Sequence, residues 1–477
     1  MSDCCGNNKP ANGRYDLAVI GAGSAGFSAA ITAADEGAQV AIIGHGIIGG
    51  TCVNVGCVPS KALIRAAETL HVAHAAKRFD GIEAAARVTD WQAVVKQKQE
   101  LVDGLRKAKY SDILPAYNSI AYLEGKASFD DRGALVVDGK TIGAKKIIIA
   151  TGSRPALPSI EGIEEVDYLT STTALEQETL PQSMIIIGAG YIGAEIAQVF
   201  ARAGVKITLV SRRGLLPQAE PEISEALTAY FGDEGISVVK GITYERIEQV
   251  GNDVNLHVSD DNGSRVITAE KVMIASGRTP NTDQLNLEVA GIETVANHGV
   301  KVDMQMRTTR QGVYAAGDVT GNDQFVYMAA YGAKIAAKNA LNSNSLSYDN
   351  SVMPAVVFTD PQVASVGFTE AQARAAGFDV KTSILTLDNV PRALAARDTR
   401  GLFKLVGDAK TKKLLGAHIL APEGSDSIQT AALAIQAGMT YEELGSMIFP
   451  YLTTVEGLKL AAQTFDMDVK KLSCCAG

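Results

Sequence analysis

The sequence predicts an α/β protein with two Rossmann-like domains and a C-terminal α+β domain, and three observations support this. A glycine-rich unit occurs twice, short apolar runs alternate with alanine-rich stretches, and 477 residues leave room for about three domains. Hydrophobic residues make up 46 % of the chain and charged residues 20 %, which excludes a disordered chain, a collagen-like repeat and a coiled coil.

The repeated unit is the first element and the most informative one. The segment YDLAVIGAGSAGFSAAITAADEGAQVAIIG aligns without a gap on QSMIIIGAGYIGAEIAQVFARAGVKITLVS, at an offset of 167 residues that carries Gly21 to Gly188. Each copy is typical of a strand, a glycine turn, a helix and a second strand. The first glycine permits the tight turn, the second lets the backbone approach a pyrophosphate, and the third lets the helix pack on the strand. The chain is therefore predicted to bind two dinucleotides.

The end of the second copy indicates which nicotinamide cofactor it binds. An acidic residue at the end of the second strand would hold a ribose 2′-hydroxyl and repel a 2′-phosphate. Here Ser211 occupies that place, followed by Arg212 and Arg213, whose guanidiniums suit bidentate phosphate contact. NADPH is favoured over NADH, and a solvated loop is the alternative interpretation.

The later elements follow the same pattern. KKIIIATGSRP (Lys145–Pro155) and EKVMIASGRTPN (Glu270–Asn281) are predicted to be crossover strands that end in glycine turns. VYAAGDVTG is predicted to be a strand that delivers Asp318 to a turn, followed by a helix to about Leu341. From Asn342 a polar linker leads into a last unit of strands and alanine-rich helix.

The six cysteines form three close pairs, which are Cys4 and Cys5, Cys52 and Cys57, and Cys474 and Cys475. So sparse a set cannot act as a disulfide scaffold. Cys52 and Cys57 lie in GGTCVNVGCVPSK directly after the first dinucleotide unit, and two thiols there can cycle between disulfide and dithiol. A structural zinc site would need four clustered ligands, which this segment lacks. The pair is therefore predicted to be a redox centre.

The charge balance excludes several other classes of function. Lys and Arg number 44 against 53 Asp and Glu, giving a net charge of -9 and no basic field for nucleic acid. The two long uncharged stretches near the N-terminus are interrupted by glycines, so no membrane span is expected. The N-terminus has no apolar signal region, and we expect a cytoplasmic protein.

Six motifs in a fixed order carry a resemblance to a known family. GAGSAG, GGTCVNVGCVPSK, ATGSRP, GAGYIGAE, ASGRTPN and AAGDVTG resemble the flavin disulfide reductases, the family of glutathione reductase, dihydrolipoamide dehydrogenase and mercuric reductase. The resemblance covers essentially residues 14–477. It implies FAD on the first unit, NADPH on the second, and a homodimer whose C-terminal domain completes the partner's active site.

The resemblance also implies domain boundaries and residue roles. The expected parts are a flexible leader (1–13), an FAD domain (14–170 and 280–345), an NADPH domain (171–279) and a dimerisation domain (346–477). Lys61 and Glu195 would form an ion pair beside flavin N5, with Cys57 the charge-transfer thiolate and Cys52 the interchange thiol. The other residues expected at the cofactors are Gly21, Gly23, Ala25, Gly26, Gly46, Gly50, Thr51, Ala127, Thr151, Gly152, Asp318, Val326, Gly188, Gly190, Gly193, Arg212, Arg213 and Arg278. Gly44 departs from the family, which usually has a Glu there on the adenosine ribose.

One substitution distinguishes branches of the family. The members that reduce disulfides carry a His in the run His-Pro-Thr-x-x-Glu, which protonates the leaving thiol. Here the matching run is YLTTVE, from Tyr451 to Glu456, and all six His lie at or before His418. A phenol with a pKa of about 10 is a poor proton shuttle at neutral pH, so disulfide substrates are disfavoured.

Tyr451, Tyr191 and the terminal Cys474-Cys475 pair are together similar to the mercuric reductase branch. Hg(II) is soft and prefers thiolates. The resemblance implies that Cys474 and Cys475 of one subunit take Hg(II) from cytoplasmic thiols. They pass it to Cys52 and Cys57 of the other subunit, along a path lined by Tyr191 and Tyr451. There it is reduced to Hg(0) by electrons from NADPH through FAD. Two alternatives remain, a thioredoxin-reductase-like or other disulfide reductase and a stoichiometric metal scavenger, although a scavenger has no use for NADPH.

Overall fold

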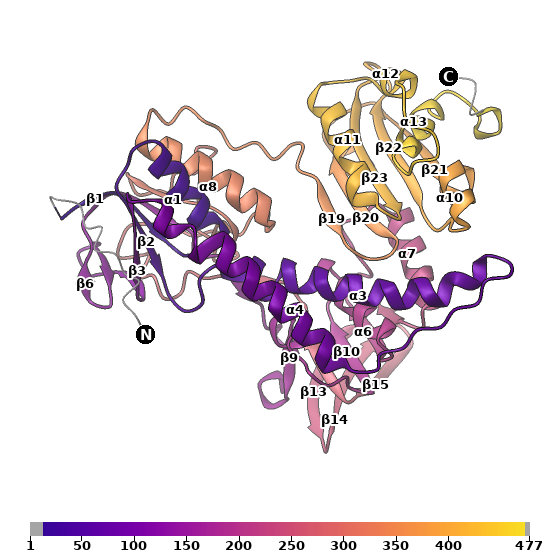
Figure 1. The fold of residues 1–477 in the computed structure, drawn as a ribbon, viewed down its shortest axis with the longest axis horizontal. Helices are drawn as coiled ribbons and strands as arrows, with labels where there is room; N and C mark the ends of the chain where they lie inside the picture. Colours follow the sequence, from indigo (N-terminus) through magenta and orange to yellow (C-terminus); the bar gives the residue numbers. More distant parts are fainter. Residues whose placement is uncertain (1–12, 473–477) are drawn as a thin grey trace. The chain divides into compact units, whose positions relative to one another are not determined.

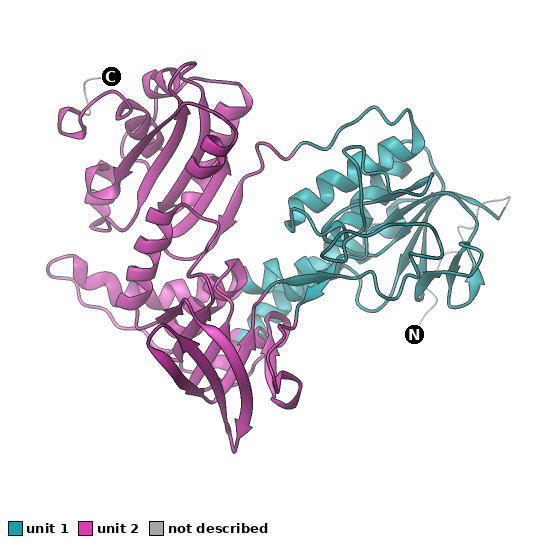
Figure 2. Cartoon of the chain, turned by 180° about the vertical axis from the view of Figure 1, so that it is seen from behind, with its two compact units in different colours: residues 1–60, 95–156, 277–349 teal, residues 61–94, 157–276, 350–477 magenta. Residues whose placement is uncertain are grey.

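The computed structural model describes residues 13–472, and the chain falls into two compact units (Figure 2). Unit 1 comprises residues 1–60, 95–156 and 277–349, and unit 2 comprises residues 61–94, 157–276 and 350–477. Two of the three predicted cysteine pairs, Cys4 with Cys5 and Cys474 with Cys475, lie outside the described residues.

Unit 1 is built on a five-stranded parallel sheet covered on both faces. Leu17 and Val19 pack against helices α1 and α8, which lie side by side (Figure 1), whereas Ala18 and Ile20 face a small antiparallel sheet. Because both faces are buried, the strands are continuous apolar runs. The elements in sheet order are β18 (Val313–Ala315), β7 (Ala144–Ile149), β1 (Tyr15–Ile20), β2 (Val40–Gly44) and β3 (Ile120–Glu124), with helices α1 (Ser24–Asp35) and α8 (Val326–Leu341) and the small sheet β4 (Ala127–Phe129), β5 (Leu135–Val137) and β6 (Lys140–Thr141).

Unit 2 contains a second five-stranded parallel sheet. A three-stranded antiparallel sheet packs on one of its faces through a shared apolar core. The parallel sheet consists of β12 (Ser237–Lys240), β11 (Lys206–Ser211), β10 (Ser183–Ile187), β16 (Lys271–Ile274) and β9 (Tyr168–Thr170); the antiparallel sheet of β13 (Thr243–Val250), β14 (Asp253–Asp260) and β15 (Gly263–Ala269); and the accompanying helices are α6 (Tyr191–Arg202) and α7 (Pro221–Asp233).

The two parallel sheets reproduce the sequence repeat in their strand register. Leu17 pairs with Val40 in unit 1, and Met184 pairs with Ile207 in unit 2, which is the same pairing shifted by the repeat offset. The agreement holds for every residue pair from Leu17–Val40 to Ile20–Ile43. The prediction of two Rossmann-like units is therefore confirmed.

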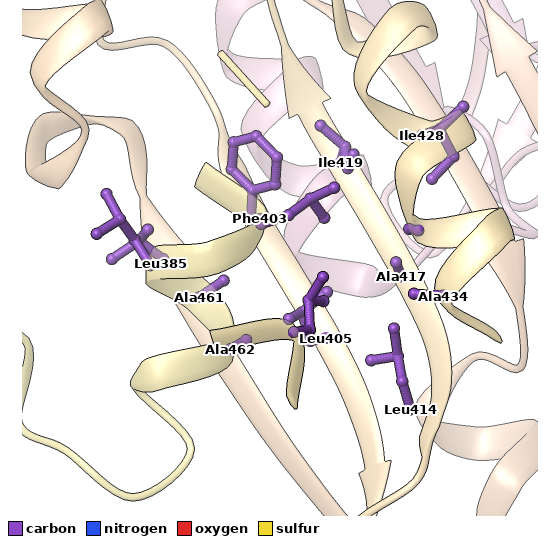
Figure 3. Close-up of a cluster of buried hydrophobic side chains, with 14 of the residues drawn as sticks. Leu385, Phe403, Leu405, Leu414, Ala417, Ile419, Ile428, Ala434, Ala461 and Ala462 are labelled. Atoms are coloured by element: carbon purple, nitrogen blue, oxygen red, sulfur yellow. The ribbon is translucent and has the colours of Figure 1, made fainter. Parts of the chain in front are cut away.

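The C-terminal part of unit 2 is an antiparallel sheet packed on helices, as the α+β prediction requires. Figure 3 shows Phe403 and Leu405 of the sheet beside Ala461 of α13, in one continuous buried cluster. The polar segment between α8 and this domain forms no helix or strand, as predicted. The elements are β19 (Ala355–Val357), β20 (Gln362–Gly367), β23 (Leu414–Ala421), β22 (Leu402–Asp408) and β21 (Val380–Thr386), with α9 (Glu370–Ala375), α10 (Pro391–Ala396), α11 (Gly424–Gln436), α12 (Tyr441–Ser446) and α13 (Glu456–Gln463).

The remaining elements carry or support the predicted site. Helix α3 begins in unit 1 and continues into unit 2, and helix α4 connects unit 2 back to unit 1. Over residues 13–472, no helix combines the length and the apolar character needed to cross a membrane. These elements are α2 (Gly50–Val55), α3 (Cys57–Ala75), α4 (Trp91–Arg106), α5 (Ser171–Ala174), β8 (Ser153–Pro155) and β17 (Arg278–Pro280).

Candidate active site

The segment that carries Cys52 and Cys57 packs directly on the first glycine turn. Cys52 lies within α2, and Cys57 begins α3 after the break at Gly56. A Cβ atom on Gly50 would stand 2.7 Å from the Cα atom of Gly23, so only glycine permits this approach. The structure thus brings the cysteine segment against the turn of the first dinucleotide unit.

Asn54, between the two cysteines, ties the segment down. Its Nδ2 atom donates to the carbonyl oxygens of Ile48 and Gly50, each at 2.9 Å. Its Oδ1 atom accepts a hydrogen bond from Arg106 Nη1 at 3.1 Å. These bonds fix α2 on its preceding turn, a role for Asn54 that the sequence analysis missed.

Both cysteines are half-buried, and the phenol of Tyr110, which is also half-buried, lies within electrostatic range of them. Tyr110 Oη lies 3.1 Å from Ser24 Oγ, at the start of α1. Burial raises the pKa of Tyr110, the hydrogen bond with Ser24 opposes the rise, and negative charge on Cys52 and Cys57 adds to it. A neutral hydroxyl group therefore stays near the two sulfurs at neutral pH.

Arg278 supplies positive charge in the same unit. Its Nε atom donates to Ser153 Oγ at 2.7 Å, and its Nη2 atom donates to the Ser153 carbonyl at 2.7 Å. Ser153 Oγ donates in turn to Asp318 Oδ2 at 2.6 Å. Burial lowers the pKa of Arg278, whereas negative charge on Asp318 and on Cys57 raises it. Because a guanidinium stays charged in proteins, Arg278 favours a thiolate at Cys57.

Two of the predicted crossover segments position this cluster by pairing with each other. Strands β8 and β17 are antiparallel, with Arg278 opposite Pro155 and Ser153 opposite Pro280. Beside them, Thr151 Oγ1 donates to the Asn281 carbonyl at 2.8 Å, and Asn281 Nδ2 donates to the Thr151 carbonyl at 2.9 Å. The motifs ATGSRP and ASGRTPN therefore form one ladder.

In unit 2, Lys61 and Glu195 form an ion pair. Lys61 Nζ donates to Glu195 Oε2 at 2.7 Å, and the Glu195 side chain is only 8 % exposed. The backbone N–H of Phe358 donates to Glu195 Oε1 at 2.9 Å, and the Phe358 ring centre lies 4.6 Å from Lys61 Nζ. The carboxylate is thus fixed by two donors, and the ammonium is partly covered by an aromatic face.

Tyr191 is the first residue of α6, one helical turn before Glu195. Residues four apart share a face of a helix, so the phenol and the carboxylate are neighbours along α6. Burial raises the pKa of Tyr191, which keeps its hydroxyl protonated at neutral pH.

Tyr451 lies on the surface of the C-terminal domain, where its side chain is 55 % exposed. The next residue, Leu452, has a left-handed backbone with φ of 61°. Glu456 is buried at the start of α13, and among the described residues its Oε2 atom has no hydrogen-bond partner. Burial raises the pKa of Glu456, and a hydrogen bond from the backbone of Leu452 opposes that rise.

The two glycine turns are too tight for any side chain at their first position. A Cβ atom on Gly21 would stand 2.2 Å from the Ala150 carbonyl oxygen, and one on Gly188 would stand 2.3 Å from that of Ala275. Helices α1, α6 and α8 begin without a capping side chain and without an acidic residue in the first turn. Their N-terminal N–H groups are thus compatible with an anion.

The end of β11 carries the predicted arginine pair. Ser211 Oγ accepts hydrogen bonds from the backbone N–H groups of Arg213 and Gly214, at 3.3 and 3.2 Å. Arg212 and Arg213 are both exposed, and no carboxylate of the described residues forms an ion pair with either. The edge of this strand is therefore cationic.

The other predicted cofactor residues fall into two groups. The third glycines of the turns, Gly26 and Gly193, pack closely, since a Cβ atom on either would stand 1.9 Å from the carbonyl oxygen of the first glycine. The rest are distributed over turns and element ends: Ala25 in α1, Gly46 and Thr51 exposed around α2, Ala127 starting β4, Gly152 before β8, Gly190 capping α6 and Val326 starting α8. Across residues 13–472, no group of three or more His, Cys, Asp or Glu side chains is arranged to hold a metal ion.

Comparison with known proteins agrees with this geometry. A family model described as pyridine nucleotide-disulphide oxidoreductase matches residues 15–337, and the model of that family's dimerisation domain matches residues 353–462. The chain is similar to mercuric reductase from Lysinibacillus sphaericus, with 48% identity over 97% of this chain and 85% of the relative. It is also similar to mercuric reductase from Streptomyces lividans, with 46% identity over 97% of this chain and 98% of the relative.

Solved structures share the fold over most of the length. The HOCl-induced flavoprotein disulfide reductase RclA from Escherichia coli superimposes with a TM-score of 0.83 at 32% identity, covering 94% of this chain and 99% of that one. The Cu(II) complex of the same protein gives a TM-score of 0.84 with the same coverage.

Proposed function

This chain belongs to the pyridine nucleotide-disulphide oxidoreductase family, and on that premise we propose that it is a mercuric reductase, which uses NADPH to reduce Hg(II) to Hg(0). The observation that carries the proposal is the similarity to mercuric reductases along nearly the whole chain. The family match and the position of the cysteine segment are consistent with it.

The cofactors are FAD on unit 1 and NADPH on the second parallel sheet. The close approach of Gly50 to Gly23 and the uncapped start of α1 fit a pyrophosphate at the first turn. The exposed Arg212 and Arg213 fit the 2′-phosphate of NADPH at the end of β11. When bound, the two cofactors supply the two electrons that the reduction of Hg(II) consumes.

Cys52 and Cys57 are the proposed ligands of the metal ion. Thiolates are the side chains that soft metals prefer, and the two residues sit on helices that follow one another directly. Arg278 favours the thiolate form of Cys57, because its charge is held in place by Ser153 and Asp318.

The chemistry of the substrate explains the missing histidine. Reduction of a disulfide to two thiols consumes two protons as well as two electrons, whereas reduction of Hg(II) to Hg(0) consumes electrons alone. A Tyr in place of the acid–base His at position 451 is therefore acceptable for the metal and unfavourable for a disulfide. Tyr191 and Tyr451 are proposed to line the path of the ion.

We propose that the active form is a homodimer with shared active sites. Supporting this, large apolar side chains are exposed on the C-terminal domain, which matches the dimerisation model, and Ile448 is 98 % exposed. Burial against a second copy would cover them. Cys474 and Cys475, outside the described residues, are proposed to take Hg(II) from cytoplasmic thiol complexes and deliver it to Cys52 and Cys57 of the partner subunit.

The decisive experiment follows NADPH oxidation by the purified FAD-loaded protein with three substrates in parallel. These are Hg(II) in excess low-molecular-weight thiol, oxidised glutathione, and a thioredoxin disulfide. Sustained oxidation with Hg(II), together with volatile mercury in the headspace, is the expected result. Turnover with a disulfide and none with Hg(II) would instead make the chain a disulfide reductase, with the terminal cysteine pair as an electron relay.

A further inference from the structure

Strand β2 ends in Gly44, where dinucleotide-binding domains place an acidic side chain on the adenosine ribose. The backbone does not explain this glycine, because Gly44 is not among the residues with a left-handed φ. A carboxylate is thus missing from a position at which the fold normally uses one, although the adjoining turn keeps the geometry for a pyrophosphate.

A tyrosine from the neighbouring strand occupies the space instead. A Cβ atom on Gly44 would stand 2.3 Å from Tyr122 Oη and 2.9 Å from Tyr122 Cε2. Tyr122 pairs with Ile42 across parallel strands, and Gly44 follows Ile42 by two residues, so Tyr122 and Gly44 lie on the same face of the sheet. The phenol thus fills the place of a side chain at position 44, and a larger residue there would have to displace it.

The hydroxyl also lies beside the turn that faces the pyrophosphate. The Cβ atom of Ala22, between the first two glycines of the turn, would be 2.8 Å from a Cβ atom on Gly44. The adenosine ribose adjoins the pyrophosphate in the cofactor, so it is expected at this edge of β2. A phenol can both donate and accept a hydrogen bond, as can a ribose hydroxyl.

We propose that the Tyr122 hydroxyl, in place of a carboxylate at position 44, hydrogen-bonds the adenosine ribose of FAD. The contact is neutral, so this end of the cofactor site carries no buried negative charge. The inference depends on FAD in unit 1 and is independent of the metal substrate.

Glu124 is the competing candidate. It pairs with Gly44 in the register of β2 and β3 and therefore lies on the same face, but it is exposed. Of the three atoms nearest to a Cβ atom placed on Gly44, two belong to Tyr122 and none belongs to Glu124. Glu124→Gln is accordingly the matched control.

The test measures cofactor affinity rather than activity. Apo-protein prepared from the full chain is titrated with FAD, and with FAD analogues that lack the 2′- or the 3′-hydroxyl of the adenosine ribose, following flavin fluorescence. Tyr122→Phe is expected to raise the Kd of FAD about fivefold, the scale of one neutral hydrogen bond. At least one deoxy analogue should bind the parent protein about fivefold more weakly than FAD binds it. The same analogue and FAD should bind the Tyr122→Phe variant equally well. Glu124→Gln should keep the parent's discrimination.

Two results would overturn the proposal. In the first, each deoxy analogue binds more weakly than FAD by the same factor in the parent and in Tyr122→Phe. In the second, Glu124→Gln binds the deoxy analogues as tightly as FAD. Tyr122→Phe retains the ring, and its thermal unfolding is compared with that of the parent to verify folding.

A further pair of variants tests whether the phenol of Tyr122 occupies the space of a side chain at position 44. Gly44→Glu should weaken FAD binding, and Gly44→Glu combined with Tyr122→Val should recover part of the loss. A double variant no better than Gly44→Glu would contradict the steric argument.

Discussion

The Lys61 ammonium lies 2.7 Å from the Glu195 carboxylate, and the same carboxylate accepts the backbone N–H of Phe358. Lys61 stands one turn after Cys57 on α3, whereas Glu195 lies on the helix that follows the second glycine turn. The ion pair therefore links the helix that starts at Cys57 to the helix that follows the second glycine turn.

Glu195→Gln is expected to lower turnover with NADPH and Hg(II) by about ten- to a hundredfold. The change keeps an oxygen for the Phe358 N–H but removes the charge-assisted bond from Lys61, which is worth roughly 1.5–3 kcal/mol. The measurement is kcat for NADPH oxidation, together with the flavin spectrum during NADPH titration.

Glu68→Gln is the control for that variant. Glu68 pairs with Arg65 at 2.6 Å on the same helix, but both side chains are more than a third exposed. An exposed pair of this kind contributes little, so turnover should stay within about twofold of the parent. Equal losses in the two variants would show that the Lys61–Glu195 pair has no special role.

Cys52→Ala and Cys57→Ala are each expected to lower Hg(II) reduction by at least about a hundredfold, because each removes a proposed ligand of the reacting ion. Transfer of electrons from NADPH to the flavin should survive in both variants, as stopped-flow absorbance of the flavin would report. Unchanged steady-state reduction by Cys52→Ala would exclude the proposed metal site.

Substitution of Cys474 and Cys475 should have a different effect from substitution of Cys52 or Cys57. The variant with Cys474→Ala and Cys475→Ala is expected to reduce Hg(II) from small thiol complexes and to lose rate chiefly with bulky ones, because delivery rather than chemistry is affected. The measurement is kcat/KM for Hg(II) complexes of increasing thiol size. A uniform loss for all complexes would place these cysteines in the chemical step.

The sequence predicted the features that depend on contacts between nearby residues, namely the glycine turns and the strands beside them. Gly21 and Gly188 each approach a carbonyl oxygen that no side chain would permit, so the turns, and the strand register that follows from them, could be inferred from spacing alone. The continuous apolar run of β1 is likewise consistent with its burial on both faces of the sheet, where successive residues enter two different cores.

The contacts that complete the site come from distant parts of the chain. Ser153 and Arg278 are 125 residues apart and meet only because β8 and β17 pair, although both lie in motifs that the sequence analysis singled out. Phe358 reaches Glu195 from a loop of the C-terminal domain that carries no motif. The contact of Tyr122 with Gly44 could be predicted only in part. The missing acid at position 44 was visible in the sequence, but the tyrosine that fills its place is brought there by the pairing of β2 with β3.

Arg212→Ala combined with Arg213→Ala is expected to reduce the preference for NADPH over NADH by about ten- to a hundredfold. Loss of charge-assisted phosphate contacts should raise KM for NADPH and leave KM for NADH nearly unchanged. Arg265→Ala, which removes an arginine paired with Asp260 elsewhere in unit 2, is the control. An unaltered ratio of kcat/KM values in the double variant would remove the argument for a 2′-phosphate site at β11.

Asp398 is expected to make folding of unit 2 sensitive to acid. Its carboxylate accepts two hydrogen bonds from the Arg400 guanidinium, at 2.9 and 2.8 Å, and one from Arg78 at 3.1 Å. Burial alone would raise the pKa of Asp398, but Arg400 and Arg78 outweigh it and hold the pKa below its ordinary value. A carboxyl group whose pKa is lower in the folded state stabilises that state above its unfolded pKa, and the contribution disappears as the pH falls through the folded pKa.

Asp398→Asn should therefore lower the melting temperature at pH 7, with a loss of roughly 2–3 kcal/mol, because it breaks a largely buried bidentate pair whose arginines keep partial contact with water. The difference from the parent should stay constant down to about pH 5 and shrink below about pH 4, where the unfolded carboxyl group takes up its proton. Thermal unfolding followed by circular dichroism between pH 7 and pH 3 measures this, with Asp283→Asn, which removes an exposed pair with Arg154, as the control. A difference that grows as the pH falls would show that Asp398 is not held ionised by its arginines.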